Sequence, residues 1–376
     1  MPEQATVPEV PFLDLAGLHA ELKEDVLAAL ADLINRSEFG TGAGVNTFEE
    51  QFAQFCGAAE CVGVSSGIDA LRLLLAAAGV RSGDEVIVPA MTFVATFEAV
   101  SQLGATPMPV DVSPDDYNID AAAAEAAIGP QVRWLLPVHL YGQLADMRRL
   151  GGIAERHDLG IVEDACQAHG AVRAGLVPGR GTAGAAFSFY PGKNLGAMGD
   201  AGAIVTDDPA IADRVRMLRE HGQRKKHRHE CIGWTGRLDA FQAAVLTCKL
   251  PRLAEWNAER RAVARLYAEL LADVGDLVLP TVAPESEHVW HLYVVCTRDP
   301  GALAEHLRAH SIVTGRHYPM PPHLTEAYAH LGYAPGAFPV AEELARTGLS
   351  LPIFPGMTQG QVEAVAEAIE EYFRNS

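Results

Sequence analysis

Residues 185–205 read AAFSFYPGKNLGAMGDAGAIV, and one lysine lies there in a turn between two apolar runs. Both runs, at 185–190 and 201–205, are short enough to be neighbouring strands. Burying an ammonium group is costly unless the group is neutralised or paired. A buried lysine with a lowered pKa is a candidate for a Schiff base with a carbonyl compound. The alternative is that Lys193 is a solvated lysine beside a Pro-Gly turn. Motifs elsewhere in the chain distinguish the two interpretations.

On the N-terminal side of this stretch, apolar runs alternate with helical segments. The runs predict seven strands, at residues 61–64, 85–89, 106–110, 134–139, 160–163, 185–190 and 202–206. Helical segments separate the first five strands, at residues 68–78, 95–103, 121–128 and 147–157. Strands that alternate with helices require crossover connections, which predicts an α/β fold with a mostly parallel, buried sheet.

The two ends of the chain differ from this alternating region. Five further helices are predicted, at residues 22–35, 46–55, 211–220, 238–249 and 253–272. The C-terminal part predicts a smaller α+β unit, with elements at residues 292–297, 302–310 and 359–373 and a loop at 317–323. We therefore expect an N-terminal arm at 1–20, a large domain at 21–252 and a small domain at 253–376.

Composition limits the classes of partner. The chain has 376 residues, 49% of them hydrophobic, and a net charge of −19, which argues against nucleic acid or an anionic membrane as a bulk partner. Its six cysteines form no CxxC pair, so a reduced compartment is expected. The first ten residues, MPEQATVPEV, have none of the features of a signal peptide, and no apolar run approaches a membrane span. These features predict a soluble, cytoplasmic protein.

Three places at predicted strand ends have side chains suited to a ligand. The segment SSGIDAL at 65–71 joins a strand to a helix, so backbone N–H groups at the start of that helix can meet an anion. The alternative is an ordinary helix cap. Asp164 ends a strand and can pair with a protonated ring nitrogen, or it can cap the following turn. Phe93 follows another strand, where it can stack on a ring or belong to the core.

Other patterns are set aside. GRGTAG at 179–184 matches the dinucleotide fingerprint in composition, but it precedes a strand instead of opening a helix. The group His221, His227, His229 and Cys231 matches no zinc spacing, and a solvated basic loop is favoured. No metal site is predicted.

The remaining candidates fit together as a site for pyridoxal 5′-phosphate (PLP). The phosphate of PLP needs fixed donors, its ring nitrogen needs an anion, and its aldehyde needs an amine. The segment at 65–71, Asp164 and Lys193 offer one of each. Gln167 and His169 follow Asp164 closely enough to line the same pocket.

The chain resembles the DegT/DnrJ/EryC1/StrS family of PLP-dependent sugar aminotransferases along nearly its whole length. The motifs that carry the resemblance are FE at 48–49, GDEVIVP at 83–89, VHLYGQ at 138–143, EDACQAHG at 163–170, residues 188–200, RLD at 237–239, QAA at 242–244 and HYP at 317–319. The motif FYPGKNLGA, with QAHGA upstream, resembles the motifs of the family branch that aminates C3 of dTDP-linked 3-keto-6-deoxyhexoses.

The resemblance implies a fold-type I homodimer with active sites shared between the subunits. Lys193 would form the Schiff base, Asp164 would pair with the ring nitrogen and Gln167 would contact the phenolic oxygen. Phe93 would stack on the ring. The phosphate would be held by Ser66, Gly67, Ile68 and Ser188. Lys226 and Thr235 would reach into the neighbouring site. The family usually has Asn in Gly-x-Asn-x-Arg, whereas this chain reads GWTGR at 233–237, which puts the phosphate contact of Thr235 in question.

The resemblance also implies a reaction. Glutamate would donate the amino group, converting PLP to its pyridoxamine form (PMP), and a sugar nucleotide would accept it. The sugar would contact His169, Tyr190, His317 and Tyr318, with Lys226 near the diphosphate. Amination at C4, an aminocyclitol substrate and a non-catalytic sensor of the same fold remain as alternatives. A dehydratase of the family would carry histidine in place of Lys193.

Overall fold

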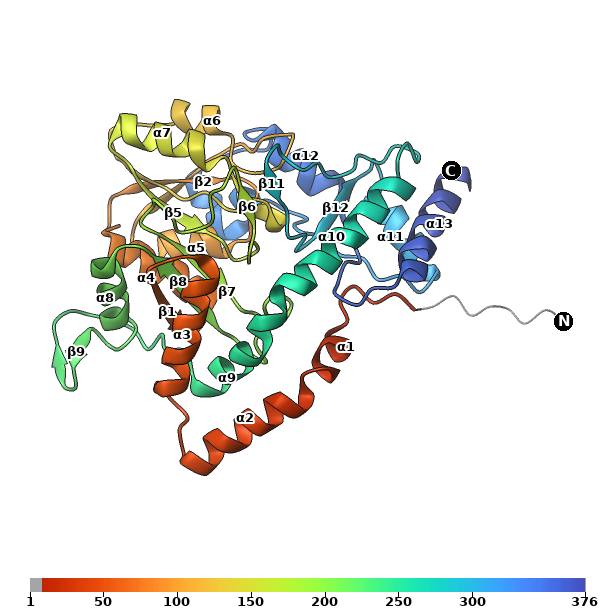
Figure 1. Cartoon of the computed structure of the whole chain (residues 1–376). Coiled ribbons are helices and arrows are strands. Elements are labelled where there is room, and N and C mark those ends of the chain that lie inside the picture. Colours follow the sequence, from red (N-terminus) through yellow and green to blue (C-terminus); the bar gives the residue numbers. More distant parts are fainter. Residues whose placement is uncertain (1–8, 376) are drawn as a thin grey trace.

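A seven-stranded sheet crosses the larger part of the molecule (Figure 1). The structure is a computed structural model that describes residues 9–375, so the first eight residues of the predicted arm lie outside the described part. The strand order is β1-β8-β7-β5-β4-β2-β3; β8 pairs antiparallel with β1 and β7, and the other neighbouring strands pair in parallel. The strands are β1 (Glu60–Val64), β2 (Glu85–Pro89), β3 (Thr106–Val110), β4 (Val132–Leu135), β5 (Gly160–Asp164), β7 (Gly184–Ser188) and β8 (Gly202–Thr206).

All seven predicted strands are present, and the mostly parallel α/β sheet is confirmed. The strand predicted at 134–139 is the least accurate, because β4 ends at Leu135. Leu136 still donates its N–H to the carbonyl oxygen of Ile87, but Pro137 has no N–H with which to continue the ladder.

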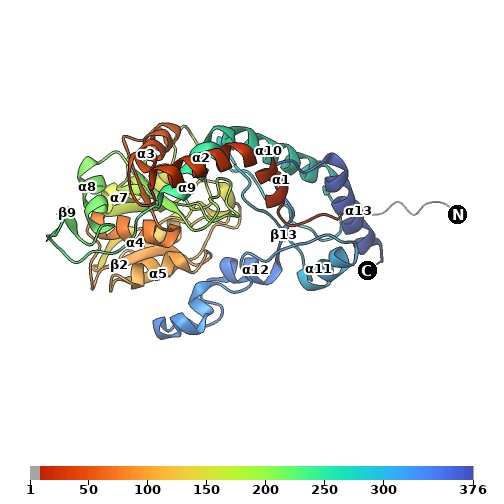
Figure 2. The same cartoon turned by 90° about the horizontal axis from the view of Figure 1, so that it is seen from below.

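Helices cover both faces of the sheet, and Figure 2 shows the two layers. One face packs against α4 (Gly67–Ala78), α5 (Ala95–Ser101) and α8 (Pro209–Leu218). The other face packs against α3 (Ala43–Cys56), α6 (Ala121–Ala126), α7 (Met147–His157) and α9 (Ala240–Lys249). The strands are therefore buried on both sides, which explains why they are continuous apolar runs.

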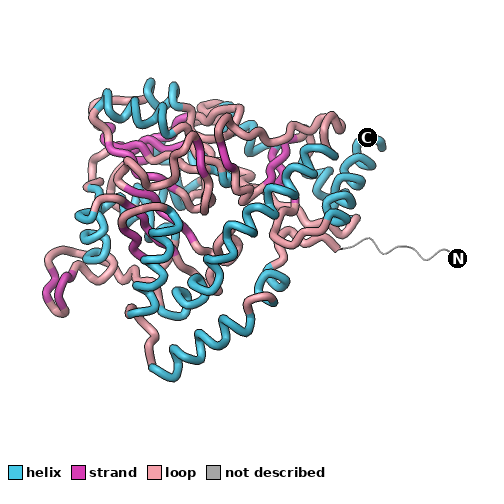
Figure 3. Tube along the Cα trace, viewed as in Figure 1, coloured by secondary structure: helices cyan, strands magenta, loops and turns pink. Residues whose placement is uncertain are grey.

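The C-terminal part has its own two-stranded sheet, visible apart from the main sheet in Figure 3. β12 (Tyr293–Cys296) pairs antiparallel with β13 (Gly348–Leu351). The helices there are α10 (Leu253–Leu270), α11 (Pro300–Ala309), α12 (Pro339–Thr347) and α13 (Gln359–Asn375). The sequence did not predict α12 or β13. The N-terminal segment joins this part through a bridge between Val10 and Ile312.

The remaining elements are short or lie at the periphery. α1 (Leu15–Ala20) and α2 (Lys23–Arg36) follow the arm, and α2 packs along α9 through Val26 and Val245. The basic segment at 221–230, read from sequence as a loop, contains a hairpin of β9 (Gln223–Lys225) and β10 (Arg228–His229). β6 (Val172–Arg173) pairs with β11 (Ser286–Glu287). Within residues 9–375, the longest helices are too polar or too short to cross a bilayer.

Candidate active site

A cavity of about 680 Å³ lies at the carboxyl ends of β5 and β7. Its wall combines residues of the large sheet with residues of the C-terminal part, including Arg260 and His317. Open parallel sheets bind ligands at this edge. The cavity is therefore the place at which the predicted site residues should meet.

Lys193 lines this cavity from the turn that follows β7. Its backbone N–H donates to the carbonyl oxygen of Tyr190 at 2.8 Å, which closes the turn. Gly196 permits the tight path of the loop, because a Cβ atom there would lie 2.3 Å from the carbonyl oxygen of Pro191. Burial lowers the pKa of Lys193, and the neighbouring Cys166 and Asp164 oppose that shift. The lysine is thus a partly buried amine, and the alternative of a solvated turn lysine does not describe it.

Asp164 is held as an oriented carboxylate beside Lys193. Its side chain accepts a hydrogen bond from the Thr96 hydroxyl at 2.8 Å and another from the backbone N–H of Cys166 at 3.1 Å. The residue is 5% exposed and lines the cavity. The bond from Cys166 shows that it also serves the following turn, as the simpler interpretation proposed. The two interpretations are compatible, because the turn fixes the direction of the carboxylate.

Gln167 has an amide whose orientation is set by its partners. Its Oε1 accepts from the backbone N–H of Tyr141 at 2.7 Å, so its Nε2 is the end that donates to the Tyr318 hydroxyl at 3.1 Å. Tyr318 in turn lies against Phe93, with ring centroids 5.5 Å apart. Gln167, Tyr318 and Phe93 line the cavity, whereas Tyr141 does not. Phe93 is 52% exposed, so it does not belong to the core.

The N-terminus of α4 forms another wall. Ser66 is the N-cap residue, and its hydroxyl accepts from the backbone N–H of Asp69 at 3.2 Å, as the ordinary cap interpretation expects. Ser66, Gly67, Ile68 and Ser188 all line the cavity. Gly67 lies so close to the end of β7 that an added Cβ would be 2.6 Å from Cβ of Ser188. The first N–H groups of a helix lack partners within the helix, so this wall can accept an anion.

Of the four residues predicted to contact the sugar, three line the cavity: Tyr190, His317 and Tyr318. His169 does not. It is fully buried, its Nε2 is 2.9 Å from the carbonyl oxygen of Ser188, and its ring packs against Phe187 and Phe189. The structure therefore gives His169 a place behind the cavity wall, and the prediction that it contacts the sugar is wrong for this geometry. From sequence alone, a histidine five residues after the end of β5 could line the cavity or belong to the core.

Lys226 and Thr235 also lie outside the cavity of their own chain. Lys226 is exposed between β9 and β10, in the hairpin that projects from the molecule in Figure 1. Thr235 is exposed, and its hydroxyl is 2.9 Å from Nε2 of His221. Their predicted roles in a neighbouring subunit's site stay predictions.

Among the site residues that were not predicted from the sequence, three affect its hydrogen bonding and charge. Arg260 on α10 lines the cavity with 2% exposure, and its Nη1 donates to the carbonyl oxygens of Trp290 and Ile353 at 3.2 and 2.9 Å. Burial lowers its pKa to about 10. His291 also lines the cavity, and burial together with Lys193 holds its pKa well below the usual range. Thr96, which orients Asp164, is the third.

The family model and the relatives that match this chain agree with one another. The profile of the DegT/DnrJ/EryC1/StrS aminotransferase family matches residues 20–370. A dTDP-3-amino-3,4,6-trideoxy-alpha-D-glucose transaminase of Streptomyces venezuelae is 47% identical over 372 residues, covering 99% of this chain and 98% of the relative. The erythromycin biosynthesis sensory transduction protein EryC1 of Saccharopolyspora erythraea is also 47% identical, covering 96% of this chain and 99% of that protein.

A solved structure agrees with the sequence matches. The crystal structure of S. venezuelae DesV in complex with a ketimine intermediate superposes with a TM-score of 0.96 at 48% identity. The alignment covers 97% of this chain and 99% of that one.

Proposed function

The chain belongs to the DegT/DnrJ/EryC1/StrS aminotransferase family, and we propose that it moves an amino group from glutamate to C3 of a dTDP-linked 3-keto-6-deoxyhexose. The observation that carries this proposal is the position of Lys193, which is partly buried in the cavity beside Asp164 and opposite the N-terminus of α4. The name of the S. venezuelae relative supports the choice of C3 and of a dTDP sugar.

The residues of the cavity fit PLP. The cavity is lined by the amine of Lys193, the carboxylate of Asp164 and the N-terminus of α4. Gly67, the first residue of α4, has no side chain and lies close to Ser188. Lys193 would hold the aldehyde carbon, Asp164 the ring nitrogen, and Ser66, Ile68 and Ser188 the phosphate. PLP supplies an electron sink that stabilises the carbanion formed when a proton leaves the amino-bearing carbon.

Lys193 is suited to move that proton at its Nζ. Because burial lowers its pKa, the neutral amine that can accept a proton is easier to reach than in water. Asp164 lines the cavity, and its carboxylate is oriented by hydrogen bonds from Thr96 and Cys166. Gln167 can present only its amide N–H₂ there, because its oxygen is bonded to Tyr141, so it suits an anionic oxygen.

The three cavity residues proposed to contact the sugar have polar side chains: His317, Tyr190 and Tyr318. His317 Nδ1 is 2.9 Å from the Ser350 hydroxyl, and burial together with Lys193 lowers the pKa of His317 to about 4. Its imidazole is therefore neutral at neutral pH. With the hydroxyls of Tyr190 and Tyr318, it offers hydrogen bonds without charge, which suits a partly deoxygenated hexose.

The diphosphate needs positive charge that a single subunit does not supply. Among the described residues that line the cavity, Lys193 and Arg260 are the lysines and arginines, and Arg260 is already bonded to backbone carbonyls. We therefore assign the diphosphate to Lys226 of a second copy of the chain, in a homodimer with shared sites. Thr235 of that copy would lie near the cofactor phosphate.

Product analysis tests the proposal. The PLP-loaded protein would be incubated with glutamate and a panel of dTDP- and UDP-linked keto sugars, and the product examined by NMR. We expect an amine-bearing C3 on a dTDP sugar. An amine at C4, or turnover of a nucleotide-free cyclitol ketone alone, would refute this assignment and leave the PLP site standing.

A sensory role is the second candidate, because the name of the S. erythraea relative describes sensory transduction. The complete set of Lys193, Asp164 and the α4 N-terminus favours catalysis, since a sensor has no need for an amine of lowered pKa. Binding of a sugar nucleotide with no turnover in the same panel would favour the sensor.

A further inference from the structure

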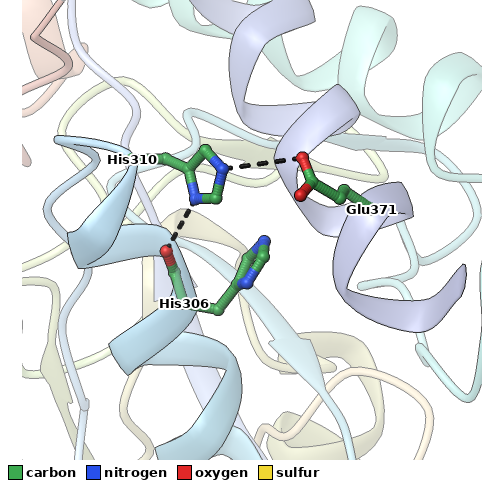
Figure 4. A group of neighbouring side chains, drawn as sticks. All are labelled: His306, His310 and Glu371. Atoms are coloured by element: carbon green, nitrogen blue, oxygen red, sulfur yellow. Dashed lines mark hydrogen bonds and ion pairs between the residues drawn. The ribbon is translucent and has the colours of Figure 1, made fainter. Parts of the chain in front are cut away.

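Two histidines and a glutamate form a cluster in the C-terminal part that the aminotransferase site does not use. His306 lies on α11, His310 follows its last residue, and Glu371 lies on α13 (Figure 4). None of the three lines the cavity that contains Lys193. We propose that this cluster binds a zinc ion that links α11 to α13. The sequence had predicted no metal site.

The spacing of the three residues suits a tetrahedral ion. His306 and His310 are four residues apart, which places both side chains on one face of a helix. One ligand atom from each residue lies within 4.8 Å of the other two. Nε2 of His310 and Oε2 of Glu371 are 3.5 Å apart. Zinc bonds of roughly 2.0–2.1 Å arranged tetrahedrally separate two ligand atoms by about 3.4 Å, whereas a charge-assisted hydrogen bond would draw them to about 2.8 Å.

Hydrogen bonding orients His310 as a ligand, and the His306 ring has a nitrogen without a partner in the described part of the chain. Nδ1 of His310 is 2.9 Å from the carbonyl oxygen of His306, so Nδ1 carries the proton and Nε2 has a free lone pair toward Glu371. Metal-binding histidines are usually oriented by this kind of bond to a backbone carbonyl. Nε2 of His306 is buried and has no hydrogen-bond partner among the described residues. This nitrogen is therefore available to bind a cation.

The electrostatic environment also favours a cation. α11 ends at Ala309, so His306 and His310 lie at its C-terminal end, where the helix dipole attracts positive charge. Arg374, the nearest basic residue in sequence to Glu371, pairs instead with Glu370 at 3.6 Å. The side chains of His310 and Glu371 are 31% and 47% exposed, which leaves room for water as a fourth ligand.

The choice of zinc follows from the donor atoms. Two imidazole nitrogens and one carboxylate oxygen are a poor set for Mg²⁺ or Ca²⁺, which prefer oxygen, and a familiar set for Zn²⁺. The rival interpretation is a surface ion pair between His310 and Glu371, which would contribute little to stability. That interpretation leaves the buried Nε2 of His306 without a partner.

Calorimetric titration of ZnCl₂ into the PLP-loaded, EDTA-treated and desalted protein tests the proposal. We expect one ion per chain and a higher midpoint of thermal unfolding with zinc. His306→Gln and Glu371→Gln should each weaken binding by more than about tenfold and leave transaminase activity unchanged. Glu371→Gln is a surface change, so it also serves if His306→Gln proves unstable. MgCl₂ should give no binding.

Two control variants locate the ion. His330→Gln removes an exposed histidine from another surface, and His229→Gln removes one from the basic hairpin. Both should bind zinc as the parent protein does. Absence of binding, binding unaffected by His306→Gln and Glu371→Gln, or binding lost in His229→Gln would each overturn the proposal.

Discussion

At the scale of single residues, burial and the positive charge of Lys193 lower the pKa of three neighbouring histidines. The pKa values of His169, His291 and His317 are all lowered, in each case by burial first and by Lys193 second. These imidazoles are therefore neutral. Among the described residues, Glu98, Asp164 and Asp200 are the carboxylates that line the cavity, and Asp164 lies beside the lysine. Of these carboxylates, Asp164 is the one assigned to the ring nitrogen of PLP.

Replacing Asp164 with asparagine tests its role. Asparagine keeps the size of the side chain and one acceptor oxygen for Thr96 or the N–H of Cys166, but it removes the charge. We expect PLP to stay bound and kcat to fall by about 100-fold or more, as when one electrostatic stabiliser is removed from other enzymes. Absorbance would report PLP content. Asp115→Asn, at an exposed loop position, is the control; equal kcat values in the two variants would reduce Asp164 to a turn cap.

His288 gives the protein a predictable sensitivity to acid. It is 5% exposed, its Nδ1 accepts the N–H of Trp290 at 2.8 Å, and burial lowers its pKa to about 3. Between about pH 6.5 and about pH 3 the unfolded chain therefore binds a proton that the folded chain does not. The free energy of unfolding must fall as pH decreases through this window, by at most roughly 1.4 kcal/mol per pH unit.

The comparison that isolates this group uses His288→Gln, whose side-chain oxygen can still accept from Trp290. Unfolding midpoints would be measured for the cofactor-free protein between pH 7 and pH 5. We expect the variant to lose less stability than the parent protein, and His330→Gln to match the parent. Parallel curves for all three would show that His288 does not titrate on unfolding.

At the scale of elements, the start of α4 must pack against the end of β7 for the anion wall to exist. In Gly67→Ala the new methyl group would lie 2.6 Å from Cβ of Ser188 and 3.2 Å from Sγ of Cys166. Overpacking of this kind costs about 1–3 kcal/mol. We expect a lower midpoint of unfolding and a higher Kd for PLP. Gly151→Ala on α7 is the control, since nothing lies within 4 Å of its added Cβ. If the two variants behave alike, the contact is not important.

The elements found from the sequence are those whose packing leaves a regular pattern. β7 and β8 are buried on both faces, so each is an unbroken apolar run. β13 and the hairpin of β9 and β10 lack such a pattern. β13 is four residues long and follows α12 directly, and the hairpin consists of polar residues that are mostly exposed. Their pairing is set by tertiary contacts that periodicity does not record.

The same limit applies to the site. Lys193, Asp164 and Gly67 follow strands or open a helix, so their place at the sheet edge could be inferred from order along the chain. Arg260 lies in the middle of α10, where a basic residue usually faces water. Its position becomes clear only when the carbonyl groups of Trp290 and Ile353 are brought to it by the fold. The position of His169 could not be inferred in the same way, because the turn after β5 directs its side chain into the core.

At the scale of the whole molecule, the proposal requires two chains. A mixture of Lys193→Ala with a Lys226→Ala/Thr235→Val double variant tests it. If the sites are shared, each mixed dimer has one site with both halves intact. Random mixing should then restore about a quarter of the parent activity at low substrate concentration. Activity equal to the average of the two separate variants would place each site within one chain.

The most direct test of the central claim is the visible absorbance of the protein with PLP, before and after glutamate. We expect the parent protein and Lys225→Ala, which changes an exposed lysine, to show the band of lysine-bound PLP. Glutamate should then convert that band to the shorter-wavelength absorbance of PMP. Lys193→Ala should show neither the lysine-bound band nor turnover. A Lys193→Ala variant with the same band and near-normal transamination would contradict the assignment of this lysine and the mechanism built on it.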